Sequence, residues 1–471
     1  MKRNTEAMYA TMRPWKLFFI VALPGMVSMF AMSIYSIIEG AFIGQTLGES
    51  AFAAINIAFP LVMINFSLAD LIGVGASVPI SIALGKQDYK TANNVFSCSV
   101  VMIFVTSLIM GSIMFLAAEP LSAMMGAEGK LLETSVRYLR TCALCSPLTS
   151  IFFAMDNYLR ISGFVKTSMI INVCSNFATI GLLAVFLFVL DMDVVGSALA
   201  TSISMCLCSV VAMIPFLAKK TLLRFTKPHF NFAMIKEISA CGSPIFLNNI
   251  SGRVTSILMN ITLISMGDAY LGEGGGTTAV AVYAVLMYSS DLCWPLLYGI
   301  SDSLAPSIGY NWGAENYDRV KKIAKCNYIG TMVVGIVSTS VLFFGAPQLA
   351  ALFANADEAR LLELSAHGIK LFCFAYLFRW VTVSTQSFLS AIEKPARATI
   401  MSVCMALVFP VLLLFTLRPL GLDGIWVNFA GVNILGVLLG VVLLLGVIKE
   451  IRKKEKTRKD NRNENQNQAV I

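Results

Sequence analysis

The sequence predicts an all-α membrane protein, with twelve transmembrane helices in two six-helix bundles related by a pseudo-twofold axis along the membrane normal. Composition is the first observation behind this fold class: the 471 residues are 57% apolar and 13% charged, with a mean hydropathy of +0.76. Soluble domains carry about 25% charged residues, so a soluble protein of this composition could hardly cover its surface. The other two observations are a series of long apolar runs and an internal repeat.

Twelve apolar runs are long enough to cross a bilayer as helices, which takes about 20 residues. They cover 17–44, 51–83, 95–118, 136–157, 167–190, 195–218, 239–266, 277–310, 326–346, 361–389, 398–417 and 424–448. The second and eighth runs are too long for one straight span and should tilt or project beyond the membrane. Long runs of this kind favour helices over barrel strands, whose signal is short alternating segments.

A motif in the first half of the chain recurs in the second half. The segment 301–317 repeats the pattern of the segment 73–89 at one constant spacing. The identical positions at this spacing are Ile80 and Ile308, Gly85 and Gly313, and Tyr89 and Tyr317. Because six spans return the chain to its starting side, the two halves would insert with the same orientation and leave a path between them.

The repeat and the changes in composition divide the chain into four parts. We expect an N-terminal six-helix bundle over 1–218, a basic cytoplasmic connector over 219–238 and a C-terminal six-helix bundle over 239–448. The segment 449–471 loses its apolar character and gains Lys, Asn and Gln, which predicts a disordered basic tail on the inner face.

The basic residues are distributed unevenly along the spans. With the N-terminus assigned to the cytosol, most of the 35 Lys and Arg residues fall in the N-terminal segment, the inner loops and the tail. The positive-inside rule then places both termini in the cytosol. We expect a multi-pass protein of the cytoplasmic (plasma) membrane of a bacterium. This distribution accounts for the net charge of +8 without a nucleic-acid partner.

No constellation in the sequence indicates an enzyme or a cofactor. Many of the eleven cysteines fall inside spans, and neither they nor the two histidines have the spacing of a metal site. A phosphate-binding GxxxxGK[ST] loop is also missing, which argues against direct use of ATP. We expect no bound metal and no cofactor, and a monomer in the lipid bilayer.

Glu39 is a candidate for coupling to a cation. A charge at the bilayer centre costs about 2.5–3.5 kcal/mol even on the mildest scale, so a carboxylate within a span needs a reason. Counted from Leu17, Glu39 is expected toward the outer side of a tilted first span. Met32, Tyr35 and Ser36 share its helix face. The carboxylate could bind and release a cation as its surroundings change, or it could be an interfacial group in water.

Arg253 and Asp291 form a second candidate site, in the C-terminal half. Counted from opposite ends of the seventh and eighth spans, both lie roughly 21 Å along their helices. Their opposite signs and similar depth predict that they approach each other. The pair would either hold two helices together or be broken by a substrate or a proton.

Four more polar residues at membrane depth complete the candidate cation site. Asp70 in the second span is expected to face a central cleft, and Asn157, Asn176 and Thr201 could supply neutral oxygens to a cation. The three neutral residues could instead make interhelical hydrogen bonds. Asp302 is expected nearer the cytosol and hydrated.

Methionines and aromatic residues within the spans indicate the kind of substrate. The chain has 24 methionines, and flexible thioethers with aromatic faces suit flat cationic organic molecules. Each residue could equally serve ordinary packing. The candidates for a substrate cleft are Met32, Tyr35, Met63, Met287, Tyr288 and Trp294.

Three segments also match the motifs of a known family. They are Tyr35–Gly44 (YSIIEGAFIG), Asn157–Arg160 (NYLR) and Pro306–Asn316 (PSIGYNWGAEN). With these motifs, nearly all of 15–448 resembles the MATE family, the multidrug and toxic compound extrusion transporters. The resemblance implies a two-bundle antiporter that expels organic compounds in exchange for Na⁺ or H⁺.

Two positions depart from the pattern of that family. Its first-span motif usually carries Asp where this chain has Glu39. Some relatives have Asn and then Asp four residues later in the fifth span, but Asn176 is followed at that distance by Ile180. In the other possible alignment, Thr179 and Leu183 occupy the two places. The carboxylate is missing either way, which leaves both coupling ions open.

These features predict a secondary active antiporter that exports organic, cationic compounds by alternating access. The alternative is a lipid-linked oligosaccharide flippase of the same broad superfamily. That function would favour cationic residues in the cleft, for which Arg253 is the main candidate.

Overall fold

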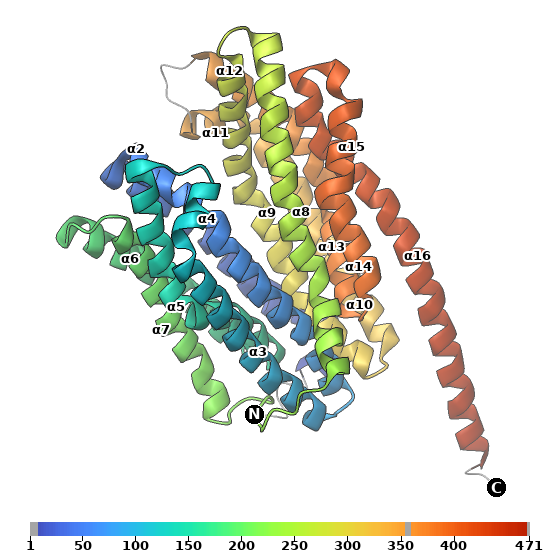
Figure 1. Ribbon diagram of the computed structural model, residues 1–471. Helices are drawn as coiled ribbons and strands as arrows, with labels where there is room; N and C mark the ends of the chain where they lie inside the picture. The colour runs from blue at the N-terminus through green and yellow to red at the C-terminus, as the bar shows by residue number, and fades with distance from the viewer. Residues whose placement is uncertain (1–7, 354–358, 469–471) are drawn as a thin grey trace.

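The computed structural model describes residues 8–353 and 359–468, and these residues form helices and connecting turns (Figure 1). Within the described residues, twelve helices are long and apolar enough to cross a membrane. They confirm the all-α membrane fold class predicted from the sequence.

The helices divide into two sets that lie on opposite sides of the molecule (Figure 1). The N-terminal set contains α2 (Pro14–Gly85), α3 (Tyr89–Leu116), α4 (Ala118–Met124), α5 (Gly129–Ile161), α6 (Val165–Ala184) and α7 (Val194–Leu217). The C-terminal set contains α8 (Phe232–Leu271), α9 (Gly275–Gly313), α10 (Tyr317–Phe344), α11 (Ala346–Phe353), α12 (Ala359–Phe372), α13 (Tyr376–Ala391), α14 (Pro395–Val403), α15 (Phe409–Thr416) and α16 (Leu422–Gln468). This is the predicted two-bundle arrangement.

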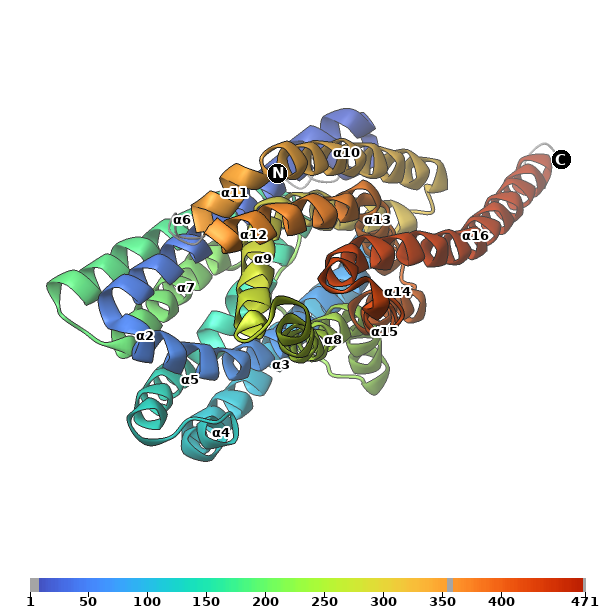
Figure 2. The ribbon, with the colours of Figure 1, turned by 90° about the horizontal axis from the view of Figure 1, so that it is seen from above.

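The first two spans belong to one helical segment. The sequence shows two separate apolar runs, but the backbone of α2 stays helical through both spans, Pro14–Gly40 and Ala53–Gly85. The residues between them contain no proline to interrupt the helical hydrogen bonds. Figure 2 shows the blue ribbon turning back on itself between the two spans.

Prolines within the spans leave backbone carbonyls without their usual helical partner, and nearby hydroxyls bind two of these carbonyls. Pro244 frees the carbonyl of Ala240, which accepts a hydrogen bond of 2.8 Å from Ser243 Oγ. In α15, Pro410 frees the carbonyl of Ala406, and Thr255 Oγ1 of α8 donates to it over 2.5 Å. Satisfying freed carbonyls in this way lets proline remain inside membrane helices.

The repeated motif builds the same turn in both halves. After Gly85, Gln87 adopts a φ of 61° and Asp88 caps α3 by accepting a hydrogen bond from Thr91 N over 3.0 Å. After Gly313, Glu315 adopts a φ of 55° and Asn316 caps α10 in the same way, with Arg319 N as donor at 3.3 Å. Side-chain oxygens at this position satisfy backbone N–H groups that a helix start leaves unpaired.

The two copies of this motif also pack against each other. A Cβ added to Gly85 would lie 2.0 Å from the carbonyl oxygen of Tyr310, and one added to Gly313 would lie 2.1 Å from that of Ile82. The contact is therefore reciprocal between α2 and α9, as expected across a pseudo-twofold axis. Small residues allow such close approach of membrane helices.

The segment before α2 adds a second connection between the halves. The hydroxyl of Tyr9, which is buried, donates to the backbone carbonyl of Arg160 in the N-terminal half. The backbone carbonyl of Tyr9 accepts hydrogen bonds from Asn311 Nδ2 at 3.0 Å and Arg319 Nε at 2.8 Å in the C-terminal half. One residue thus joins α5 to α9 and α10.

The connector differs from the sequence prediction at its C-terminal end. Helix α8 begins at Phe232, so the last residues of the predicted connector 219–238 are helical. The preceding extended segment is held on α3, where Thr226 N donates to Ser97 Oγ over 2.8 Å. The two halves are consequently joined by a strand-like link that lies against the N-terminal half.

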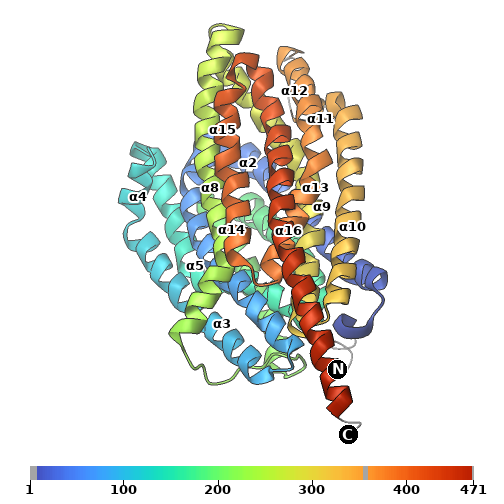
Figure 3. The same cartoon turned by 90° about the vertical axis from the view of Figure 1, so that its right-hand side faces the viewer.

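The prediction of a disordered tail over 449–471 is wrong for most of its length. Helix α16 continues to Gln468, and ion pairs join Lys394 to Glu450 over 2.8 Å and Lys321 to Glu455 over 2.6 Å. Lys and Gln, which are part of the composition that suggested disorder, also have high helix propensity, and these contacts stabilise the start of the segment as helix. The start of α2 and the end of α16 lie at the same end of the molecule (Figure 3).

The contact between the halves predicts the effect of adding one methyl group. We expect Gly313→Ala to destabilise the fold by about 1–3 kcal/mol, because the new Cβ would force α9 away from Ile82. Thermal unfolding of the purified protein in detergent would show this as a lower midpoint.

The matched control is Gly181→Ala in α6, where an added Cβ meets nothing within 4 Å. This substitution should be neutral or stabilise the helix by about 0.5–1 kcal/mol, since alanine is the better helix former. Equal unfolding midpoints for Gly313→Ala and the wild type would contradict the packing argument.

Candidate functional site

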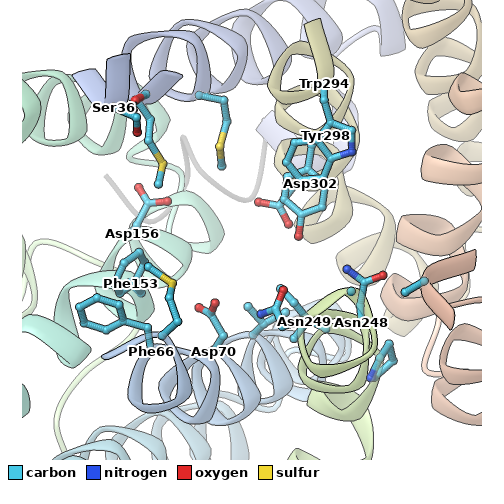
Figure 4. Close-up of a pocket in the computed structure, with 18 of the residues that line it drawn as sticks. Ser36, Phe66, Asp70, Phe153, Asp156, Asn248, Asn249, Trp294, Tyr298 and Asp302 are labelled. Atoms are coloured by element: carbon cyan, nitrogen blue, oxygen red, sulfur yellow. Dashed lines mark hydrogen bonds between the residues drawn. The ribbon is translucent and has the colours of Figure 1, made fainter. Parts of the chain in front are cut away.

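A cavity of about 830 Å³ lies between the two halves and is lined by residues of both. Its wall includes parts of α2, α5, α6 and α7 on one side and of α8, α9, α13 and α16 on the other. Figure 4 shows side chains from these helices converging on the open space.

Three carboxylates from three helices point into this cavity (Figure 4). Asp70 comes from the second span within α2, Asp156 from α5 and Asp302 from α9. Asp70 thus lies in the central cleft, where the sequence placed it. Asp70 and Asp302 interact electrostatically although they belong to different halves.

Arg160 is the cation at the centre of this group. Its guanidinium forms ion pairs with Asp156 over 2.6 Å and with Asp302 over 3.0 Å, and only 2% of the residue is exposed. Nε also donates to Ser168 Oγ at 3.3 Å. Because Asp302 belongs to α9, the arginine links the two halves at the wall of the cavity.

The sequence misplaced two members of this group. Arg160 falls outside the predicted fourth span, 136–157, and was thus counted with the inner loops, but it lies on the last turn of α5 and is buried. Asp302 was expected to be hydrated near the cytosol, but it lines the cavity and accepts the charge-assisted hydrogen bond from Arg160. Hydropathy counts residues from the ends of a span and carries no information on which helix packs alongside.

Asp156 has further partners on α6. Its Oδ1 accepts a hydrogen bond from Asn172 Nδ2 at 2.6 Å and one from the Ser168 hydroxyl. These bonds satisfy lone pairs that the ion pair leaves open and fix the orientation of the carboxylate, as a buried charge requires.

Glu39 lies in the N-terminal half with two of its predicted companions. Thr201 Oγ1 donates to Glu39 Oε1 over 3.2 Å, and the hydroxyls of Tyr35 and Thr201 are 3.5 Å apart. All three residues line the cavity. A carboxylate surrounded by hydroxyl oxygens offers ligands of the kind that hard cations prefer.

Asn157 and Asn176 line the same cavity from α5 and α6. Asn157 Nδ2 donates to the carbonyl of Phe153, in its own helix, over 3.3 Å. The five candidate cation-coupling residues predicted from the sequence therefore line one cavity, although they do not form one contact cluster.

The predicted pair of Arg253 and Asp291 is not formed. Both residues are exposed, neither lines the cavity, and no ion pair joins them among those of the described residues. Asp291 instead interacts electrostatically with Arg379 of α13. Equal depth along two helices does not require that the two side chains face each other.

The predicted substrate-cleft residues divide into two groups. Met32, Tyr35, Met63 and Trp294 line the cavity. The other two do not: Met287 packs against the buried core of the C-terminal half, and Tyr288 is 46% exposed on the outer surface.

Sequence analysis missed several residues of the C-terminal wall. Arg379 lines the cavity, as do Asn248 and Asn249 of α8, which Figure 4 shows below the open space. A spacing signal was present on α9, where Trp294, Tyr298 and Asp302 follow one another at four-residue intervals on one helix face.

Neither histidines nor cysteines contribute a metal centre in the described part of the chain. No group of three or more His, Cys, Asp or Glu residues there could hold a metal ion, and the eleven cysteines are free.

A helical membrane protein built from two repeated halves, with a polar cavity between them, has the architecture of a secondary transporter. The model of the MatE family matches residues 24–185 and 244–416, which include most of both bundles. The chain therefore belongs to the MatE family, as the motifs around Glu39 and Gly313 suggested.

Two relatives show the extent of the similarity. The chain is 28% identical over 410 residues to the multidrug export protein MepA of Staphylococcus aureus, which covers 86% of this chain and 87% of that protein. It is 28% identical over 407 residues to MepA of Staphylococcus saprophyticus, with the same coverage of 86% and 87%.

Solved structures share the fold. The fold is similar to that of a multidrug resistance MATE family transporter in an outward-facing conformation, with a TM-score of 0.85, 23% identity, and coverage of 94% of this chain and 97% of that one. A MOP superfamily transporter from Pyrococcus furiosus gives a TM-score of 0.83 at 21% identity, covering 96% of this chain and 99% of that one.

The ion pairs of Arg160 predict a large effect on stability. We expect Arg160→Met to cost up to about 3–5 kcal/mol of the free energy of unfolding, because the partly buried carboxylates Asp156 and Asp302 would lose their shared counter-charge. The measurement is thermal unfolding in detergent at constant pH and salt.

Arg137→Met is the control, because the ion pair of Arg137 with Asp193 at 2.5 Å is about half exposed. An exposed pair of this kind contributes less than about 1 kcal/mol. Similar losses of stability in the two variants would show that the burial of Arg160 does not determine how much its ion pairs contribute to the free energy of unfolding.

Proposed function

We propose that this chain is a secondary active multidrug efflux antiporter, which exchanges organic cations for Na⁺ or H⁺ by alternating access. It would act in the bacterial cytoplasmic membrane with both termini in the cytosol. A single chain contains both halves and the whole cavity, so the proposed working unit is a monomer.

The charge of the cavity is the observation that carries this proposal. The charged residues among its described lining are Glu39, Asp70, Asp156, Asp302, Arg160 and Arg379. Carboxylates outnumber arginines by two, so the cavity attracts cations. The relatives named multidrug export proteins support the same kind of substrate.

The apolar part of the lining supports a broad range of substrates. Met32 and Met63 lie on the N-terminal side, and Phe66 and Phe153 pack together there with ring centroids 5.0 Å apart. Thioether chains change conformation readily and aromatic faces attract organic cations. Such a wall can adapt to molecules of different shape without dedicated hydrogen bonds.

The coupling ion would bind at Glu39, where Thr201 and Tyr35 supply hydroxyl oxygens beside the carboxylate. Either a proton or Na⁺ neutralises the carboxylate and lowers the cost of burying it. An organic cation and the coupling ion would then compete for the negative charge of one cavity, which gives exchange.

The ion pair between Arg160 and Asp302 would act in the change of access. It joins α5 to α9, so it must break when the two halves separate at this level. A substrate cation near Asp302 competes with Arg160 for the carboxylate and weakens the link. Binding of substrate is thereby connected to movement of the halves.

The lining also bears on the alternative function, a lipid-linked oligosaccharide flippase. An anionic pyrophosphate lipid would need several unpaired cations in the cleft. Arg253, the main candidate for that role, does not line the cavity, and Arg160 is already paired with two carboxylates. Arg379 is then the one arginine of the described lining without an ion pair, too few for a pyrophosphate. The acidic cavity favours the export of cations.

Transport in proteoliposomes tests the proposal. We expect an imposed Na⁺ gradient or an imposed pH gradient, each applied separately, to drive accumulation or release of the cationic dye ethidium. Protein-free liposomes give the background. Absence of transport under both gradients, across a panel of cationic dyes, would contradict the antiporter function.

Glu39→Gln tests the coupling site. Since the amide cannot exchange a proton or a cation, we expect gradient-driven efflux to fall at least about fivefold, the lower end of typical coupling between two ligands. Glu119→Gln, an exposed residue of α4 outside the cavity, should leave efflux unchanged. Full gradient-driven efflux by Glu39→Gln at equal protein levels would remove Glu39 from the coupling mechanism.

A further inference from the structure

A second pocket lies outside the central cavity, at the end of the molecule where α2 begins and α16 ends (Figure 3). Its volume is about 520 Å³. The two repeated turns both line it: Gln87 from the N-terminal half and Glu315 from the C-terminal half, with φ angles of 61° and 55°. Ala10 and Glu455 line it from segments near the two ends of the chain. The pocket therefore joins both halves at their junction.

The charged side chains among the described lining of this pocket are all acidic. They are Glu315, Asp318 and Glu455. Lys321, which is outside the lining, forms an ion pair with Glu455 over 2.6 Å. Asp318, in the first turn of α10, forms no ion pair among those of the described residues. The pocket thus keeps an excess of negative charge, which attracts cations.

Asn311 is an independent indication of a ligand. The residue lines the pocket and is only 1% exposed. Its Nδ2 donates to the carbonyl of Tyr9 at 3.0 Å and to that of Ser307 at 2.8 Å, so Oδ1 is the amide atom left for a ligand. Oδ1 is buried and has no hydrogen-bond partner within the described part of the chain. Because an unsatisfied buried acceptor costs free energy, a donor bound in the pocket would be stabilised there.

Aromatic rings beside these acceptors favour an aliphatic ammonium group. Tyr317 lines the pocket and packs edge-on against Trp312, with ring centroids 5.3 Å apart. The ammonium nitrogen of Lys454 lies 4.6 Å from the centroid of the same Trp312 ring. Ring faces attract ammonium groups, and alkyl chains pack against apolar surface. The surroundings of the pocket thus already hold one alkylammonium group.

The arrangement of the carboxylates argues against a bound metal ion. A divalent cation needs several oxygens that converge on it at about 2.0–2.6 Å. No group of three or more His, Cys, Asp or Glu residues in the described ranges could hold such an ion. Glu315 comes from the turn after α9, Asp318 from α10 and Glu455 from α16. Acceptors spread over a pocket suit a flexible cation with several separate ammonium groups, which are hydrogen-bond donors only.

We propose that this pocket is a binding site for linear polyamines, with ammonium groups against Glu315 and Asp318 and at Asn311 Oδ1. The site is separate from the central cavity, since the two sets of described lining residues share no member. A bound polyamine contacts both repeated turns, so it stabilises the arrangement in which the halves meet there. Under alternating access it would slow export, and this regulatory step alone rests on the proposed function.

Binding of spermidine to the purified full-length chain in detergent tests the site, by titration calorimetry at constant ionic strength. We expect the double variant Glu315→Gln, Asp318→Asn to raise the dissociation constant about tenfold or more, equivalent to about 1.4 kcal/mol, because two of three carboxylates lose their charge. Gln suits the backbone at 315, since Gln87 adopts the same conformation in the other copy of the turn. The unfolding midpoint without spermidine checks that the variant is folded.

Asp88→Asn is the matched control. Asp88 is exposed in the equivalent turn of the N-terminal half but does not line the pocket, and Asn316 shows that asparagine can cap a helix at this place. The control should change the dissociation constant less than about twofold, because salt screens exposed charges outside the site. The proposal is overturned if the wild type shows no saturable binding of spermidine. It is also overturned if the double variant binds like the wild type, or if Asp88→Asn weakens binding as much as the double variant does.

Ethidium efflux from proteoliposomes tests the regulatory step separately. Spermidine on both sides, at a concentration equal to its dissociation constant, should slow efflux by the wild type about twofold, since half of the sites are then occupied. The double variant should be slowed much less. No slowing of the wild type, or equal slowing of the two proteins, would overturn the regulatory step. Efflux absent even without spermidine would contradict the proposed export function, a failure that the binding measurement in detergent distinguishes from failure of the site.

Discussion

The reciprocal contact between α2 and α9 is the constraint on which the rest of the structure depends. Gly85 lies against the backbone at Tyr310, and Gly313 lies against the backbone at Ile82, so no side chain separates the two helices there. Within a membrane, apolar burial drives helix association weakly, and close van der Waals contact takes its place. This contact holds the halves together and leaves the cavity to form where they are not in contact.

Around this junction, an ion pair and hydrogen bonds connect the two halves. Arg160 of α5 reaches Asp302 of α9, and Tyr9 connects the backbone of Arg160 to Asn311. In a medium of low dielectric, separating a charged pair leaves each charge without its partner, which costs free energy. The pair therefore favours the arrangement of the halves in which it is formed over intermediate arrangements. A substrate or ion that supplies a replacement charge changes that balance.

The two halves repeat the same helical scaffold, but the polar side chains that they present to the cavity differ. The turns after Gly85 and Gly313 have the same kind of cap and a residue with positive φ at the same position. In contrast, the pair of Glu39 and Thr201 belongs to the N-terminal half, and Arg379, which lies over the Trp294 ring, belongs to the C-terminal half. A cavity between such halves is electrically asymmetric. Under the proposed antiport function, it would bind the coupling ion and the organic substrate at different places and still bring their charges into competition.

The sequence by itself determined the twelve spans, the two repeated halves and the family, because hydropathy and motif spacing are local properties of the chain. It also placed Asp70, Glu39 and Trp294 at the depth where the cavity lies. Only the tertiary structure decided that Arg160 is buried and paired with two carboxylates. It also decided that Asp291 interacts electrostatically with Arg379 and not, as expected, with Arg253. Counting residues along a span gives height in the membrane, but the direction in which a side chain points, and the helix it meets there, depend on packing between segments far apart in the chain.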